Sequence, residues 1–229
     1  MNFKQRSNTK ELLDGDQIPF EDILVNMQEL NTINTLLGGH AITVEGIKVL
    51  ARSKKQLHIC EIGCGGGDNL VAIAKYAKAN KINLYITGID IKQACIEVAK
   101  GRDLLHNAEL IVSDYQAVSF ATKPDIIFSS LFCHHFSHAQ LIEQVQWMKA
   151  NAAIGFFIND LQRNWLAYHS IKILTQLFSS SYLVKHDAPL SVARGFHKKE
   201  WMKIFNDAKI DRYTVQWKWA FRYLIVVKN

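Results

Sequence analysis

The stretch CEIGCGGGDN, residues 60–69, carries the strongest chemical signal in the sequence. An apolar run precedes it and a helical pattern follows it, so Gly63 and Gly65 lie where a ligand can approach the backbone closely. A dinucleotide-binding turn has a third glycine where Asp68 stands, and a carboxylate there would repel two phosphates. The turn therefore favours a ligand that lacks phosphate and is positively charged near the glycines. We expect Asp68 to cap the following helix.

Acidic residues also end the next two apolar runs. Asp90 lies about 20 residues beyond the turn, at the end of the next apolar run. A carboxylate at this position can accept hydrogen bonds from both hydroxyls of a ribose. Asp114 ends the following run and can accept a hydrogen bond from an adenine amine. Each one alone can equally be an ordinary turn aspartate. Together with the glycine turn, the row of acids favours a nucleoside-containing ligand.

Histidines follow a further apolar run in SSLFCHHFSH, residues 129–138. A histidine titrates near neutral pH and can accept a phenolic proton. We predict that His135 is a general base, or His134 if the turn is rotated; the alternative is that His135 only packs in the turn. Adjacent histidines rarely point the same way, so we expect no metal site here.

The elements that must position these residues alternate between β-rich runs and helical periods, which predicts a doubly wound α/β sheet. Parallel strands are expected at residues 57–63, 83–90, 108–114, 124–132 and 153–160. Two further runs, 213–219 and 221–229, are joined by so short a link that they must pair as an antiparallel hairpin.

We expect a single domain over residues 1–229. It divides into an N-terminal helical cap (1–52), a ligand-binding core (57–160), a helical cover insert (161–196), and a final helix and hairpin (197–229). The insert has an apolar stripe at helical spacing and follows the carboxyl end of a strand, where open α/β sheets bind ligands. An extra helix that patches the sheet, or a surface that docks on a membrane, are the alternatives. The stripe consists of Leu166, Ile173, Leu174, Leu177 and Phe178.

Composition limits the class of protein. The 229 residues are 48% hydrophobic and 21% charged with a net charge of +6, which is typical of a globular domain. The positive charge is dispersed, so no nucleic-acid partner is expected, although the charge of +6 leaves methylation of RNA as an open alternative. The start of the chain is polar and no apolar run reaches the ~18 residues of a membrane span. With four cysteines in no zinc-binding pattern, we expect a cytoplasmic protein without stable membrane insertion.

At these motifs the sequence resembles the class I S-adenosylmethionine-dependent methyltransferases. CEIGCGGGDN resembles their first motif, GID their ribose-binding acid and VSDY their adenine-side motif. The resemblance implies a Rossmann-like, seven-stranded sheet with the last strand inserted antiparallel. It also implies S-adenosylmethionine as the cofactor, with the methionine part near the glycine turn, the ribose at Asp90 and the base beside Asp114. The cofactor-binding residues it implies are Glu61, Gly63, Cys64, Gly65, Asp90, Ile91, Asp114, Tyr115 and Leu131.

The residues after the fourth strand narrow the choice of acceptor. Methyltransferases of base amines or glutamine amides have an Asn/Asp-Pro-Pro-Tyr/Phe motif there, and this sequence has Ser-Ser-Leu-Phe instead. It resembles the small-molecule branch, near the ubiquinone/menaquinone and polyketide methyltransferases. We predict transfer to oxygen of a small phenolic, quinol or polyketide-like acceptor by a monomer or homodimer. The residues expected to bind the acceptor are Asp160, Arg163, Tyr168 and Arg194.

Other functions remain open at this point. Methylation of an aromatic or quinol ring at carbon would need the same pocket. An NAD-dependent oxidoreductase shares the fold class, although Asp68 opposes it. A cofactor-binding protein without catalysis is the third alternative.

Overall fold

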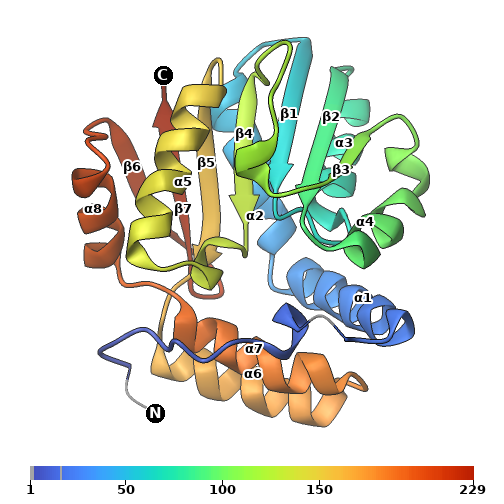
Figure 1. Cartoon of the computed structure of the whole chain (residues 1–229), viewed down its shortest axis with the longest axis vertical. Coiled ribbons are helices and arrows are strands. Elements are labelled where there is room, and N and C mark those ends of the chain that lie inside the picture. The colour runs from blue at the N-terminus through green and yellow to red at the C-terminus, as the bar shows by residue number, and fades with distance from the viewer. Residues whose placement is uncertain (1–2, 16) are drawn as a thin grey trace.

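A seven-stranded sheet forms the centre of the structure, a computed structural model that describes residues 3–15 and 17–229 (Figure 1). The strand order is β3-β2-β1-β4-β5-β7-β6, and β1 to β5 are parallel. The strands are β1 (Gln56–Ile62), β2 (Asn83–Asp90), β3 (Glu109–Val112), β4 (Ile126–Ser130), β5 (Gly155–Leu161), β6 (Tyr213–Lys218) and β7 (Arg222–Lys228). The predicted fold, including the antiparallel hairpin, is confirmed.

The hairpin is inserted so that β7 lies between β5 and β6 and pairs antiparallel with both. Residues of β4, β5 and β7 are almost all buried, because helices cover both faces of the sheet. In this register Leu161 at the carboxyl end of β5 pairs with Arg222 at the start of β7. The beginning of β7 therefore lies at the same sheet edge as the ends of the parallel strands.

Helices cover the two faces in separate groups. The buried side chains of α2 (Gly39–Ala51), α3 (Asp68–Ala79) and α4 (Gln93–Lys100) pack in one core cluster with Phe128 and Phe157. Those of α5 (His138–Asn151) and α8 (Lys198–Asp207) pack on the other face with Phe156 and Ile158. Alternation along β5 thus sends successive phenylalanines into opposite cores.

Three more helices lie across the carboxyl edge of the parallel strands, at the lower end of the sheet in Figure 1. They are α1 (Phe20–Leu36), α6 (Trp165–Phe178) and α7 (Tyr182–Arg194). Residues 3–15, which we call the N-terminal strap, run along α7 (Figure 1). The strap is fixed there because the Asp187 carboxylate accepts hydrogen bonds from the backbone N–H groups of Leu12 and Leu13 at 2.8 and 2.9 Å. Short 3₁₀ turns are η1 (Leu12–Asp14), η2 (Asp103–Leu105), η3 (Tyr115–Ala117) and η4 (Cys133–His135).

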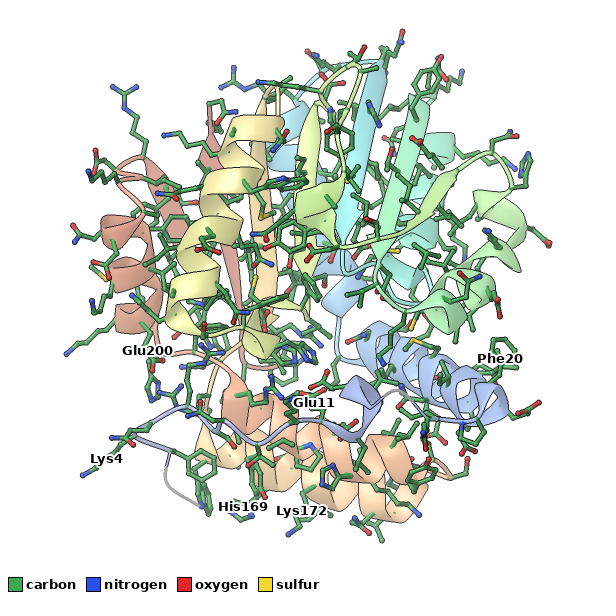
Figure 2. The ribbon with its side chains drawn as sticks, viewed as in Figure 1. Lys4, Glu11, Phe20, His169, Lys172 and Glu200 are labelled. Atoms are coloured by element: carbon green, nitrogen blue, oxygen red, sulfur yellow. The ribbon has the colours of Figure 1, made fainter. Side chains whose placement is uncertain are left out.

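The apolar stripe of α6, which lies within the predicted cover insert, is largely exposed. Leu177 and Phe178 are 69% and 79% exposed, and only Leu174 of the stripe lines the cavity described below. Figure 2 shows His169 and Lys172 on the outer side of the same helix. Within the described part of the chain, no helix is long and apolar enough to cross a membrane.

Candidate active site

A cavity of 670 Å³ opens at the carboxyl ends of the parallel strands. Its walls come from the glycine turn, the ends of β2, β3 and β4, helices α1 and α6, the N-terminal strap and the β6–β7 turn. This volume lies within the range of small-molecule and cofactor sites, roughly 300–1,000 Å³. All nine residues predicted to bind the cofactor line this cavity.

The glycine turn has the backbone conformation that its composition predicts. Gly63 has φ +66° and Gly65 has φ +51°, and a Cβ atom at Gly63 would clash with the Phe132 ring. The helix cap expected from Asp68 is wrong, because Gly67 (φ +75°) is the N-cap residue and Asp68 lies in the first turn. The Asp68 carboxylate instead accepts a hydrogen bond of 2.5 Å from Arg102.

Asp90 ties the turn to the end of β2. Its carboxylate accepts hydrogen bonds from the Gly65 N–H at 2.8 Å and the Lys92 N–H at 2.9 Å. Burial raises the pKa of Asp90, although both hydrogen bonds act in the opposite direction. Asp114, the other predicted nucleoside-binding acid, accepts from the Gln116 N–H at 2.9 Å and caps η3.

Glu61 has an unsatisfied carboxylate oxygen inside the protein. Its Oε1 accepts a hydrogen bond of 3.0 Å from Asn69, whereas the buried Oε2 has no partner among the described residues. Burial raises the pKa of Glu61 well above its usual range. An unpaired carboxylate oxygen beside a glycine turn fits the ammonium group of a methionine moiety, so these residues suit S-adenosylmethionine.

Leu131 follows β4 in a strained conformation. Its φ is +53°, which is uncommon for a leucine, and its N–H donates to the Asn159 carbonyl at 2.9 Å. Strained residues of this kind cluster at ligand sites, where the surrounding fold enforces them. The turn sends the chain directly into η4, which carries the two histidines.

His134 and His135 come together with carboxylates from distant parts of the chain. His134 Nδ1 lies 2.8 Å from Asp160 Oδ1, and His134 Nε2 lies 3.5 Å from Glu11 Oε1. His135 Nδ1 lies 3.1 Å from Asp14 Oδ1, and His135 Nε2 lies 3.7 Å from Glu11 Oε2. Figure 2 shows Glu11 on the strap, between the sheet edge and α7.

This arrangement contradicts the expectation that adjacent histidines point apart. The two rings have centroids 4.5 Å apart at 33°, because the 3₁₀ geometry of η4 lets both face the strap. Potential ligand atoms of Glu11, His134 and His135 all lie within 4.8 Å of one another. The absence of a bound metal stays a prediction.

The four predicted acceptor-binding residues do not line the cavity, and for Asp160 and Arg163 the predicted orientation toward the crevice is wrong. Asp160 is fully buried against His134, and its Oδ1 also accepts from the Leu161 N–H at 2.7 Å. Arg194 donates to the carbonyls of His134 at 3.1 Å and Thr9 at 2.9 Å.

Arg163 and Tyr168 are likewise used within the fold. Arg163 donates to the Phe3 carbonyl at 2.9 Å, to the Gly195 carbonyl at 2.5 Å and to Glu200 at 2.8 Å. Tyr168 packs edge-on against Phe3. Both residues therefore hold the strap rather than a ligand.

Several polar residues of the cavity were not predicted from the sequence, including three charged ones on the strap and β7. Glu11 and Asp14 come from the strap, and Arg222 comes from the first position of β7. The strap has no helical or strand period, and Arg222 precedes an otherwise apolar strand. No local pattern marks these positions as parts of a site.

Part of the chain matches a known protein family. Residues 59–152 match the family model of the methyltransferase domain. No curated protein sequence matches the chain.

Solved structures of low identity share the fold. The plantazolicin methyltransferase BpumL in complex with S-adenosylhomocysteine is 21% identical with a TM-score of 0.63, over 85% of this chain and 72% of that one. The same enzyme with a pentazolic desmethyl-plantazolicin analogue is 18% identical with a TM-score of 0.67, over 91% and 90%. Magnesium protoporphyrin IX methyltransferase from Synechocystis with bound S-adenosylhomocysteine is 14% identical with a TM-score of 0.54, over 93% and 89%. Because residues 59–152 match the methyltransferase domain and the sheet has the expected strand order, the core of this chain is a methyltransferase domain with the fold of the S-adenosylmethionine-dependent enzymes.

Proposed function

We propose that this enzyme methylates an oxygen of a small phenolic, quinol or polyketide-like acceptor, with His135 as the general base. The observation that carries the proposal is the 3.1 Å contact between His135 Nδ1 and Asp14 Oδ1 inside the cavity that the glycine turn and Asp90 also line. A carboxylate on Nδ1 fixes the tautomer, and Nε2, which lies 3.7 Å from Glu11 Oε2 and so beyond hydrogen-bonding distance, can still accept a proton. The residues proposed to bind the cofactor and the proposed base therefore line the same cavity.

His134 is the poorer candidate for the base. Burial alone would lower its pKa, but Asp160 and Glu11 outweigh burial and raise it to about 9. His134 is therefore protonated at neutral pH and has no free nitrogen to accept a proton. It serves instead as a fixed cation that holds Glu11 beside His135.

The nucleoside-binding acids and the glycine turn support the same chemistry. S-adenosylmethionine supplies an activated methyl group on a sulfonium sulfur when it is bound. Glu61 offers its unpaired oxygen to an ammonium group, and Asp90 and Asp114 offer carboxylates to the nucleoside. His135 then removes the hydroxyl proton as the acceptor oxygen attacks, and holding the two reactants in line contributes much of the rate.

Apolar residues form part of the cavity wall, which favours an aromatic acceptor. Leu30, Ile33 and Leu37 of the α1 region and Ile171 and Leu174 of α6 all line the cavity. Flat aromatic rings fill such walls without leaving polar groups unpaired. A small acceptor in a cytoplasmic setting is part of the proposal.

The test begins with calorimetric titration of S-adenosylmethionine, S-adenosylhomocysteine and NADH. Binding of the first two is expected, and binding of NADH alone would refute the cofactor assignment. Phenolic and quinol acceptors are then screened with methyl-labelled cofactor, and NMR of the product separates a methoxy group from a ring methyl group. A ring methyl product would replace oxygen transfer by carbon transfer in the same cavity.

His135→Gln tests the base. It is expected to lower kcat by about 10²–10⁴-fold with the affinity for S-adenosylhomocysteine unchanged. His138→Gln is the matched control, because His138 lies on the same segment but pairs with Asp207 outside the cavity. Unchanged turnover in His135→Gln would refute the assignment of His135 as the general base.

A further inference from the structure

Arg222 is a buried cation with unused hydrogen-bond donors. The residue is 3% exposed and lines the cavity at the start of β7. Its Nη2 donates to Asn34 Oδ1 at 2.8 Å, but Nε and Nη1 have no partner among the described residues. Buried guanidinium groups are normally paired with a carboxylate or with several carbonyls, so this one lacks an acceptor.

The other two buried arginines show what a satisfied guanidinium looks like in this protein. Arg163 reaches the carbonyls of Phe3 and Gly195 and the carboxylate of Glu200, and Arg194 reaches two carbonyls. Arg222 has only a neutral amide oxygen. It lines the cavity, whereas Arg163 and Arg194 bind the strap and do not.

No carboxylate of the described chain neutralises Arg222 within 4.0 Å. Burial lowers the pKa of Arg222 to about 10, and Asp160 is the one acid that opposes this effect. Asp160 pairs across the ladder with Tyr223, and its carboxylate is committed to His134 and the Leu161 N–H. The positive charge at Arg222 is therefore available to an anion in the cavity.

The surroundings leave space for this group. A Cβ atom at Gly39 would lie 3.2 Å from Cζ and Nη2 of Arg222. Glycine at this position therefore leaves room for the guanidinium to pack against the helix backbone. Phe221 and Leu161 continue the wall on either side, and both line the cavity. The guanidinium of Arg222, with apolar side chains on either side, is suited to bind a planar ligand that carries a carboxylate.

The sheet order separates Arg222 from the glycine turn. Between β1, which precedes the turn, and β7 lie β4 and β5. Three steps between neighbouring strands amount to roughly 14 Å. Arg222 therefore lies toward the acceptor part of the cavity, away from the residues that hold the cofactor.

We propose that Arg222, with Asn34, forms a carboxylate-binding subsite, so that the acceptor is an anionic hydroxyaryl carboxylate. The inference rests on the proposed function because it assigns the charge of the same acceptor. Nη1 and the second N–H of Nη2, which lie side by side at the end of the guanidinium, bind the carboxylate as a fork, and the ring places its hydroxyl toward the histidine cluster. A neutral phenol leaves the same donors unpaired.

Binding to the protein saturated with S-adenosylhomocysteine tests the subsite, with salicylate and phenol as probes that differ by the carboxylate. The wild-type protein is expected to bind salicylate about tenfold or more tightly than phenol, because charge-assisted hydrogen bonds are lost with phenol. Arg222→Met is expected to abolish the preference, and Arg222→Lys to retain part of it. Arg212→Met, at an exposed position, is the control and keeps the wild-type preference.

Thermal unfolding separates a binding role from a structural one. Arg222→Met is expected to raise Tm without ligand, because it removes a buried, unpaired charge. A lower Tm together with an unchanged probe preference would assign Arg222 to the fold and overturn the subsite. Lack of any preference in the wild-type protein would overturn it as well.

The same titrations distinguish the origin of the carboxylate. Arg222→Met is expected to bind S-adenosylhomocysteine with wild-type affinity. A tenfold or greater loss would mean that Arg222 holds the carboxylate of the cofactor, which overturns the assignment to the acceptor. Failure of the wild-type protein to bind S-adenosylhomocysteine would instead refute the proposed function itself.

Discussion

His134 Nδ1 lies 2.8 Å from Asp160 Oδ1, and both side chains are buried at the point where η4 meets the end of β5. The contact joins the segment after β4 to the end of β5. Glu11 extends it to the N-terminal strap, with its Oε1 3.5 Å from His134 Nε2. One imidazole thus links three parts of the chain around the cavity, and its charge state should influence the stability of the whole arrangement.

The first prediction concerns pH. The folded-state pKa of His134 is raised from 6.5 to about 9, mainly because Asp160 and Glu11 outweigh burial. A raised pKa stabilises the fold below the unfolded value, and this stabilisation is lost as pH rises through the folded value. The free energy of unfolding should therefore fall by about 3 kcal/mol between pH 6.5 and pH 9 or above. Urea unfolding across this range measures it.

Asp160→Asn provides the comparison, because it removes the carboxylate that raises the pKa of His134. Its unfolding free energy should depend much less on pH in the same window. Asp207→Asn breaks a matched but exposed pair, His138 with Asp207 at 2.8 Å, and should retain the wild-type pH dependence. Equal pH slopes for wild type and Asp160→Asn would refute a charged His134.

The glycine turn and Asp90 could be predicted from the sequence because their signals are local. The glycines, the strand before them and the helix after them lie within a dozen residues or so, about the length of one strand–turn–helix connection. The acid at the end of the next strand follows from the same repeat. Local backbone chemistry is thus enough to locate the cofactor part of the cavity.

The acceptor part could not be predicted in the same way. The contact between Asp14 and His135 joins residues that are 121 positions apart, and no period in the strap signals it. Asp160 lies near the end of a strand, as predicted, yet its side chain turns into the core to meet His134. The direction in which a side chain points at the end of a strand depends on how the neighbouring segments pack against it. The sequence pattern alone does not contain this information.

A second prediction tests the turn. Gly63→Ala requires an alanine at φ +66° and a Cβ atom that clashes with the Phe132 ring, so the unfolding free energy should fall by roughly 2–4 kcal/mol. Gly101→Ala is the control, because Gly101 has φ −72° and its nearest neighbour would lie 3.4 Å from the new Cβ. Gly101→Ala should be neutral or slightly stabilising. Wild-type stability in Gly63→Ala would show that the turn tolerates a side chain.

A third prediction concerns cofactor affinity. Asp90→Ala removes the carboxylate proposed to bind the ribose, and it also frees the Gly65 and Lys92 N–H groups. The Kd for S-adenosylhomocysteine should rise by about 10- to 100-fold, as expected for the loss of charge-assisted hydrogen bonds. Asp211→Ala removes an exposed acid and should leave the Kd unchanged. Calorimetry measures both, and an unchanged Kd in Asp90→Ala would remove Asp90 from the cofactor site.

The fourth prediction separates two buried arginines that look alike in the sequence. Arg163 is fully enclosed and binds the strap, helix α7 through Gly195 next to its end, and Glu200 of α8. Arg163→Met leaves these acceptors unpaired, so the unfolding free energy should fall by about 3–5 kcal/mol while any folded protein still binds S-adenosylhomocysteine. Glu200→Gln keeps an acceptor for Arg163 and should lose less stability.

Comparison with Arg222→Met makes the test decisive, because the two substitutions are chemically identical and both positions are buried. Arg163→Met should lower Tm and Arg222→Met should raise it, since one guanidinium is satisfied by the fold and the other has two unpaired donors. A loss of acceptor preference in Arg163→Met at full stability would restore the role in acceptor binding that its sequence position suggested. Opposite shifts in Tm would instead show that Arg163 stabilises the fold, whereas Arg222 destabilises it and is available to bind a ligand.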